Sequence, residues 1–286
     1  MIPIRDYRPS GVVPYVTVAL ILINMLAYVY QLTLSDSTAI SVSLRWVDGC
    51  AWQEVFGARS SPPGFDPQLY RVFAGGRGCQ YPVSERSYFV IQYGLIPGEF
   101  WRGQDLPPTA PLPVWATILT SMFLHGGLLH LLGNMLYLWI FGDNVEGAMG
   151  HAKFFLFYLA CGVGGAVTQA AVAAGSTAPM IGASGAIAGV LGAYLILFPW
   201  SRVLTLVPIF FFIQLVEVPA VIILGLWFVI QFLSGLADLS ALSGVAWFAH
   251  LGGFLTGAML VFPLKRRHVA AGLVDWLRRR RSPWGW

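Results

Sequence analysis

Apolar stretches separated by short polar breaks run along most of the chain, and their lengths predict helices that cross a membrane. A helix needs about 20 apolar residues to cross a hydrocarbon core. The first stretch reaches this length and no small-residue cleavage site follows it, so we expect a retained helix rather than a signal peptide. The six predicted spans cover approximately residues 12–32, 128–148, 154–174, 184–198, 219–236 and 245–264.

The regions between the spans have different patterns. Residues 33–113 form a long loop rich in glycine, proline and aromatic residues. Residues 114–125 are apolar but stop at Gly126-Gly127, which indicates a short helix or an interfacial segment leading into the next span. The stretch between residues 198 and 218 is apolar but interrupted, so we expect it to lie in the membrane interface rather than to cross. Its interruptions are Pro199, Pro208, Gln214 and Glu217.

The composition indicates that lipid is the main solvent of this chain. Of the 286 residues, 57% are apolar and 10% are charged, and the mean hydropathy is +0.68. A soluble domain carries roughly 25% charged residues. The sequence therefore predicts an all-α membrane protein, with a six-transmembrane-helix bundle at residues 12–264 between a short N-terminus, residues 1–11, and a basic tail, residues 265–286.

Basic residues flank the predicted spans on one side. Arg5 and Arg8 precede the first span, Lys153 follows the second, Arg202 follows the fourth, and an arginine-rich tail follows the sixth. The positive-inside rule makes that side the cytoplasm, so both termini are expected there and the loop 33–113 outside. A basic tail directly after a span favours anionic lipid over nucleic acid as its partner. The short polar tails and the lack of a targeting segment favour a bacterial plasma membrane.

Three cysteines occur in the sequence, and they are too scattered to form a metal site. Cys161 lies in an apolar stretch and is expected to pack in the interior. Cys50 and Cys79 share the long outer loop, and the sequence is compatible with a disulfide between them and with two free thiols.

A few polar side chains lie inside the apolar spans, where they are costly and therefore indicate function. His130 and Asn134 are four residues apart on one face of the second span. Ser184 begins the fourth span, and His250 lies in the first half of the sixth. Because these three spans all run inward from outside, the four side chains share one layer, roughly 10 Å below the outer surface.

Ser184 has two interpretations. Serine favours the first position of a helix as an N-cap, and it is also a possible nucleophile. Gly182 and Gly185 leave room for a substrate backbone. The free N–H groups at a helix N-terminus suit a developing oxyanion. Capping and catalysis are compatible here.

Glycines on the sixth span favour contact between His250 and Ser184. Gly253 and Gly257 follow His250 by three and seven residues on the same face, so this face can approach the glycine-rich fourth span closely. Generic membrane packing would by itself explain most of these glycines. In the functional interpretation, His250 takes the Ser184 proton. Neither span carries Asp or Glu, so the pair would be a dyad.

Other polar groups also have open interpretations. His130 and Asn134 either bridge helices or donate hydrogen bonds to an oxyanion. His125, at the Gly-Gly break, either supports this site or only anchors the loop. Rival chemistries lack their residues, because the chain has no His-Glu-x-x-His zinc motif, and Asp143 and Glu146 lie toward the inner side rather than forming a facing pair.

Three motifs stand in order along the chain: His125-Gly-Gly-Leu-Leu-His130-Leu-Leu-Gly-Asn134-Met, Gly182-Ala-Ser184-Gly185 and Ala249-His250-Leu-Gly-Gly253. Together they resemble the rhomboid family of intramembrane serine proteases, over roughly residues 115–263 and the first span. The resemblance implies a six-helix core without a cofactor. It also implies cleavage of membrane-protein substrates in or near their transmembrane segments, with water reaching the site from outside.

Carried over by position, the resemblance implies that Ser184 is the nucleophile and His250 the base. It implies an oxyanion site made by Asn134, His130 and the Ser184 backbone N–H.

Two places depart from the family pattern. Many members carry Trp-Arg in the loop before the second span, where this chain reads Trp115-Ala116-Thr117, so the loop architecture of those members is not carried over. Some members stack an aromatic residue, four positions after the nucleophile, on the histidine; this chain has Ala188 there, and Trp247 or Phe248 would have to brace the imidazole instead. The run Glu99-Phe100-Trp101-Arg102 either anchors the outer loop at the interface or belongs to a poorly ordered insert.

Two other classes of protein fit part of the pattern. A non-catalytic relative that binds membrane spans without cutting them would lack the nucleophile or the base, and both are present. A transporter would show repeated halves and midplane charges, which the sequence does not. Neither the substrate nor the oligomeric state follows from the sequence.

Overall fold

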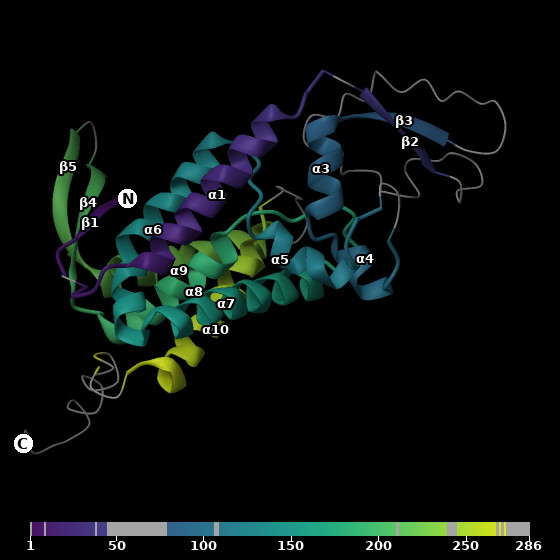
Figure 1. Cartoon of the computed structure of the whole chain (residues 1–286). Coiled ribbons are helices and arrows are strands. Elements are labelled where there is room, and N and C mark those ends of the chain that lie inside the picture. The colour runs from purple at the N-terminus through teal and green to yellow at the C-terminus, as the bar shows by residue number, and fades with distance from the viewer. Residues whose placement is uncertain are drawn as a thin grey trace, which may run out of the picture.

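Helices make up most of the computed structural model, which describes residues 2–8, 10–37, 39–44, 79–105, 109–209, 212–238, 245–266, 269 and 272. Figure 1 shows the long helices packed as a bundle, with a small sheet at one end and short helices at the other. The chain is therefore mostly helical, as the apolar pattern predicts.

Long helices fall on all the predicted apolar spans. They are α1 (Tyr15–Thr33), α6 (Leu128–Met149), α7 (His151–Val172), α8 (Ser184–Leu197), α9 (Ala220–Asp238) and α10 (Trp247–Leu264). Four of these, α1, α7, α9 and α10, are long and apolar enough to cross a membrane by length and composition. The 14-residue α8 is a shorter apolar helix, and α6 does not belong to this set. The number of membrane crossings stays a prediction.

The centre of the bundle is α8, which packs against α6, α7, α9 and α10. Its side chains from Gly185 to Tyr194 are all buried. Most of them are small, which lets four neighbouring helices approach one helix closely. Cys161 of α7 is 0% exposed, so the expectation that it packs in the interior is confirmed.

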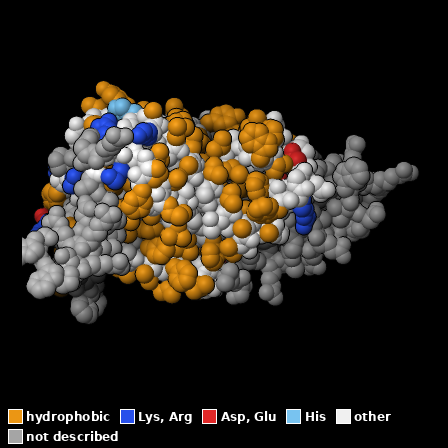
Figure 2. Space-filling model, turned by 90° about the horizontal axis from the view of Figure 1, so that it is seen from below, with side chains coloured by type: hydrophobic (Ala, Val, Ile, Leu, Met, Phe, Trp, Pro, Cys, Tyr) orange, Lys and Arg blue, Asp and Glu red, His pale blue; other side chains and the backbone are white. Residues whose placement is uncertain are grey.

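Apolar side chains also cover much of the outer surface. Leu26 of α1 is 68% exposed, and Leu233 of α9 is 57% exposed. Figure 2 shows hydrophobic side chains across the middle of one face, while most of the visible Lys and Arg gather near the end that carries the N-terminus in Figure 1. A surface of this kind suits a lipid environment, because exposing so large an apolar area to water would be unfavourable.

Strands near the N-terminal end correct the all-α prediction. The strands β1 (Ile2–Asp6), β4 (Arg202–Ile209) and β5 (Phe212–Pro219) form an antiparallel sheet in the order β1-β4-β5. The hairpin register runs from Arg202 opposite Pro219 to Ile209 opposite Phe212. This is the stretch that we expected to lie in the membrane interface rather than to cross; it forms a hairpin, and its place relative to the membrane stays a prediction. Burial in β4 alternates at Val203 and Thr205, and these β-branched residues favour a strand.

Short elements at the opposite end come from the long loop and the segment after it. The strands β2 (Ala39–Leu44) and β3 (Cys79–Ser84) pair antiparallel, and α3 (Glu85–Tyr93), α4 (Pro97–Arg102), η2 (Val114–Ala116) and α5 (Thr117–Ser121) follow. The short helix expected within residues 114–125 is therefore present. Cys50 lies outside the described residues, so its pairing with Cys79 stays open.

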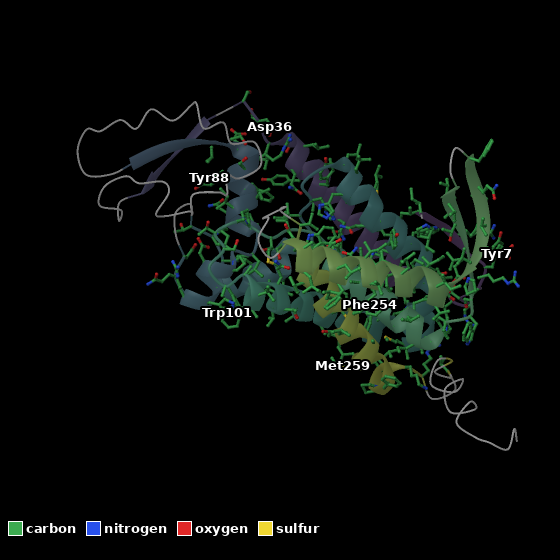
Figure 3. The ribbon with its side chains drawn as sticks, turned by 180° about the vertical axis from the view of Figure 1, so that it is seen from behind. Tyr7, Asp36, Tyr88, Trp101, Phe254 and Met259 are labelled. Carbon is green, nitrogen blue, oxygen red and sulfur yellow. The ribbon has the colours of Figure 1, made fainter. Side chains whose placement is uncertain are left out.

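The aromatic run in α4 is tied to the bundle. The Trp101 indole N–H donates a hydrogen bond to the Ala170 carbonyl of α7 at 2.8 Å, although 51% of Trp101 stays exposed. The backbone N–H of Gly98 donates to the Ser176 carbonyl at 2.8 Å. Figure 3 shows Trp101, Tyr88 and Asp36 at this end of the molecule and Tyr7 at the sheet end. The α4 segment is thus attached to the bundle, and its place at the membrane interface stays a prediction.

Candidate active site

Ser184 is the first residue of α8, and its hydroxyl faces α10. The Ser184 Oγ lies 2.8 Å from Nε2 of His250. The residue before it, Ala183, occupies the N-cap position, and no side chain caps the helix. The serine therefore stands one position past the cap, and its hydroxyl contacts the imidazole. Both residues are half-buried, so the pair is sheltered but reachable.

Glycines hold the two helices close enough for this contact. A Cβ on Gly253 would lie 1.9 Å from the Gly185 carbonyl oxygen, and a Cβ on Gly257 would lie 2.0 Å from the Gly189 carbonyl oxygen. A Cβ on Gly192 would lie 2.2 Å from the Phe254 carbonyl oxygen. No other residue type fits at these positions without moving the backbones apart. The glycine faces of α8 and α10 therefore set the separation of Ser184 and His250.

The third helix, α7, fixes the start of α10. The side-chain oxygen of Gln169 accepts hydrogen bonds from the backbone N–H groups of Phe248 at 3.0 Å and Ala249 at 3.2 Å. These N–H groups belong to the first turn, where a helix offers no carbonyl four residues earlier, and the Ala249 N–H is shared with the Ala246 carbonyl at 3.0 Å. Gln169 thus caps α10 directly before His250. Sequence reasoning missed this residue, and its only signal was a polar side chain near the end of an apolar span.

The other nitrogen of His250 has a partner on α9. His250 Nδ1 lies 2.6 Å from the side-chain oxygen of Gln231, which is 8% exposed. The sequence predicts a dyad because the spans of Ser184 and His250 carry no carboxylate, whereas the partner of Nδ1 is an amide on α9. The signal that could have found Gln231 is an amide side chain within an apolar span.

Two tryptophans flank the imidazole where Ala188 leaves no aromatic ring. The ring of Trp227 on α9 lies 6.0 Å from that of His250 at an interplanar angle of 39°, and the ring of Trp247 lies 6.3 Å away, edge-on at 88°. Of the two residues expected to brace the imidazole, Trp247 therefore contacts it. Phe248 instead faces Gly235 of α9.

Gly182 separates Ser184 from the histidine of α6. Its φ of +129° favours glycine, and a Cβ there would lie 2.9 Å from His130 Nε2 and 3.6 Å from Ser184 Oγ. The Gly182 N–H donates to the Ser121 carbonyl at 2.8 Å, which holds the loop in place. Because Gly182 has no side chain, a small space remains between His130 and Ser184.

Asn134 and His125 form a buried pair beside this space. The Asn134 side-chain nitrogen lies 3.0 Å from His125 Nε2, and the His125 and His130 rings meet edge-on at 5.1 Å. The pKa of His125, which lies in the loop before α6, is lowered to about 4, mainly by burial and also by the neighbouring His130. His125 is therefore neutral near pH 7, and its Nε2 can accept an N–H of Asn134. The second N–H of that amide stays available.

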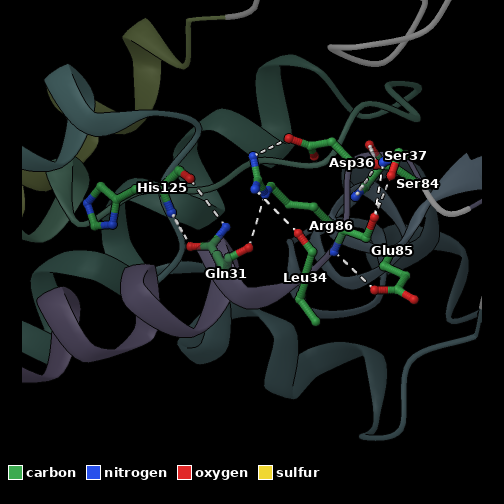
Figure 4. A network of polar contacts seen from close by, with 10 residues as sticks. Gln31, Leu34, Asp36, Ser37, Ser84, Glu85, Arg86 and His125 are labelled. Carbon is green, nitrogen blue, oxygen red and sulfur yellow. Dashed lines mark hydrogen bonds and ion pairs between the residues drawn. The ribbon is translucent and has the colours of Figure 1, made fainter.

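His125 is also tied to the end of α1, as Figure 4 shows. The His125 N–H donates to Gln31 Oε1 at 3.0 Å, and Gln31 Nε2 donates to the His125 carbonyl at 3.3 Å. Arg86 of α3 donates to the carbonyls of Gln31 at 3.0 Å and Leu34 at 3.3 Å and pairs with Asp36 at 2.6 Å. His125 thus anchors the loop and also contacts Asn134, and its role in supporting the site stays a prediction.

A serine hydroxyl in contact with an imidazole, bordered by further polar side chains within a helical bundle, is the arrangement that serine hydrolases use. Comparison with known proteins gives a more specific result, a single family. The Rhomboid domain family model matches residues 112–267, which include all three motifs. The chain belongs to the rhomboid family and is an integral multi-pass membrane protein.

Several curated relatives share this domain. RHOMBOID-like protein 4 of Arabidopsis thaliana is 35% identical over 173 residues, which cover 58% of this chain and 37% of that protein. Rhomboid protease GluP of Bacillus subtilis (strain 168) is 44% identical over 81 residues, 28% of this chain and 15% of that protein. Rhomboid protein 1, mitochondrial, of Saccharomyces cerevisiae is 32% identical over 152 residues, 50% of this chain and 40% of that protein.

The chain thus spans less than half the length of these relatives. They come from a plant, a bacterium and yeast, so the likeness is not restricted to bacteria. The bacterial plasma membrane stays a prediction.

Proposed function

We propose that this protein is an intramembrane serine protease that hydrolyses peptide bonds in or near the transmembrane segments of membrane proteins. The observation that carries the proposal is the 2.8 Å contact between Ser184 Oγ and His250 Nε2. The family membership supports it, because one of the curated relatives is named a rhomboid protease.

In the proposed reaction, Ser184 Oγ attacks the carbonyl carbon of the substrate while its proton passes to His250 Nε2. The tetrahedral intermediate then collapses, His250 gives the proton to the leaving amine, and an acyl-enzyme remains on Ser184. Water, deprotonated by His250, attacks the acyl carbon and releases the second product. The proton returns to Ser184, so the enzyme is restored.

The charge of each tetrahedral intermediate falls on the former carbonyl oxygen. The candidate donors to this oxygen are the Ser184 backbone N–H, His130 and the second N–H of Asn134. The shared space beside Gly182 supports this assignment, because His130 Nε2 and Ser184 Oγ lie on its borders. Donors fixed before the reaction stabilise such a charge without reorganising.

The proposed topology has six membrane crossings, with both termini cytoplasmic and the site open to the outer face. It is supported by the basic flanks and by the arrangement of the molecule. The sheet that contains β1 lies at one end, and α3, α4 and α5 lie at the other (Figure 1). Substrates would be single-span or multi-span membrane proteins in the surrounding bilayer.

The test compares Ser184→Ala with a matched control, Ser176→Ala. Ser176 lies in the turn that precedes α8 and accepts a hydrogen bond from the Ala178 N–H at 3.2 Å, outside the candidate pair. Each full-length protein is incubated in detergent with a single-span substrate, and product is measured on gels. We expect Ser184→Ala to lose about 10⁴-fold or more of the cleavage rate and Ser176→Ala to retain it. Equal product from Ser184→Ala and the wild-type protein would remove Ser184 as nucleophile and leave a binding protein or a contaminant as the explanation.

A further inference from the structure

The ring of His250 has a polar partner at each nitrogen. Nε2 faces the Ser184 hydroxyl at 2.8 Å, and Nδ1 faces the side-chain oxygen of Gln231 at 2.6 Å. Ser184 belongs to α8 and Gln231 to α9, so the imidazole bridges two helices that flank α10. Gln231 is 8% exposed, and water therefore has little access to compete for this contact.

If His250 acts as a base, its tautomer is determined by which ring nitrogen must accept the proton. To accept the Ser184 proton, Nε2 needs a free lone pair, so the neutral ring must carry its hydrogen on Nδ1. An acceptor at Nδ1 favours that tautomer, and a carboxylate is the usual acceptor. Within the described residues, no carboxylate lies within 4.0 Å of His250. The amide oxygen of Gln231 can accept the same N–H without a charge.

Trp227 and Gln231 present one face of α9 to the imidazole. They are four residues apart in sequence, which places them on the same side of a helix. The Trp227 ring lies 6.0 Å from the His250 ring, while the Gln231 oxygen contacts its Nδ1. The other titratable side chains nearby are His130 of α6 and Asp238, which accepts a hydrogen bond from the Trp247 indole at 3.2 Å. None of these groups contacts Nδ1.

Burying an amide in an apolar helix is costly unless it makes hydrogen bonds. The contact with His250 therefore explains why α9 carries glutamine at this point. We propose that Gln231 is a positioning residue, which accepts the Nδ1–H of His250 and holds Nε2 toward Ser184, as an uncharged substitute for the carboxylate of a triad. The inference rests on the proposed function of the Ser184–His250 pair.

The direct test is the tautomer of His250 in the wild-type protein. Nitrogen NMR of the full chain with ¹⁵N-labelled histidine distinguishes Nδ1–H from Nε2–H, and the His250 signals are identified by their loss in His250→Ala. We expect neutral His250 to be in the Nδ1–H form. A dominant Nε2–H form in the wild-type protein would overturn the proposal whether or not any substrate is cleaved. This readout is independent of activity, so it separates failure of this inference from failure of the proposed protease function.

Variants then separate positioning from helix packing. Gln231→Met keeps the side-chain length and removes the acceptor, while Gln231→Glu restores an acceptor. Gln214→Met makes the same chemical change on the exposed strand β5, away from the site, and serves as the matched control. Cleavage in detergent is measured against pH, together with the rate of labelling by a fluorophosphonate and the thermal midpoint of each protein.

We expect Gln231→Met to lower kcat by about 10- to 100-fold with little change in KM, a fraction of the roughly 10²–10⁴-fold contribution of a general base. Gln231→Glu should keep much of the activity, with the acid limb of its pH–rate profile moved to higher pH, because a carboxylate stabilises the imidazolium. Equal losses in both variants, with no movement of the acid limb, would indicate a packing role. Wild-type kcat in Gln231→Met would overturn the proposal as well.

Discussion

Around Ser184, single side chains are held by partners from several helices. Asn134 is oriented by His125, which is itself held by Gln31, and His130 lies across Gly182 from the serine. The neutral state of His125 matters here, because a protonated ring would present a donor to the Asn134 amide instead of an acceptor. The candidate oxyanion donors are therefore fixed before a substrate arrives.

At the residue scale, we predict that His130→Ala and Asn134→Ala each lower kcat by about 10²–10³-fold, the usual cost of removing one oxyanion donor. KM should change little, because these donors act mainly on the transition state. Steady-state kinetics with a single-span substrate measure both constants. If either variant raised KM at unchanged kcat, that residue would contribute to substrate binding rather than to the oxyanion site.

The residues of the site differ in how far the sequence predicts them. Ser184, His250, His130 and Asn134 are visible as polar groups within apolar spans, and the shared direction of their three spans predicts that they lie in one layer. Gln231 and Gln169 are equally polar, but their partners lie on other helices, and sequence spacing alone does not indicate which helices touch. The positive φ of Gly182 is likewise a consequence of the loop that joins α7 to α8, which no local pattern describes.

Among the elements, the pairing of α8 with α10 determines whether a site forms. Backbone carbonyls of Gly185 and Gly189 occupy the volume that side chains at Gly253 and Gly257 would fill. Helices in lipid lack a hydrophobic drive toward each other, so close packing of this kind supplies much of their attraction. The same contact sets the distance between the serine and the histidine.

We predict at this scale that Gly253→Ala lowers both the thermal midpoint in detergent and the cleavage rate. The new methyl would meet a carbonyl oxygen at 1.9 Å, and overpacking typically costs about 1–3 kcal/mol. Gly225→Ala on α9 is the control, because nothing lies within 4 Å of its Cβ position. Equal thermal midpoints and equal cleavage rates in the two variants would contradict the proposed role of the α8–α10 contact.

Helices follow from long apolar runs, so their positions could be predicted closely, whereas the strands could not. Residues 202–219 are mostly apolar on both strands and contain two prolines within the hairpin, at 208 and 219, which obscures the alternation that indicates a sheet. Pairing with β1, about 200 residues earlier in the chain, is a long-range contact that no local window reveals.

Over the whole molecule, the two ends differ in character. The sheet that contains β1 and the last turn of α10 lie on one side of the bundle, and the elements of residues 79–121 lie on the opposite side (Figure 1). Ser184 starts α8 and His250 lies near the start of α10, so the pair is nearer the end that carries α3, α4 and α5. In the proposed topology this is the outer end, where the pair would meet water and a substrate within the bilayer.

The proposed topology predicts that opposite ends are reachable from opposite sides of the membrane. In a background with Cys50 and Cys79 changed to serine, a membrane-impermeant maleimide should label Thr109→Cys in intact cells. It should label Leu215→Cys, at a position 61% exposed on β5, only after permeabilisation. The reverse pattern would contradict the orientation without affecting the chemistry at Ser184.

The role of Ser184 as a nucleophile activated by His250 is tested by locating the site of covalent modification. A fluorophosphonate that abolishes cleavage by the full-length protein is mapped by mass spectrometry of its peptides. We predict one adduct, on Ser184 Oγ, which forms much more slowly in His250→Ala than in the wild-type protein. Complete inhibition with the adduct on another residue, and with Ser184 unmodified, would contradict this role.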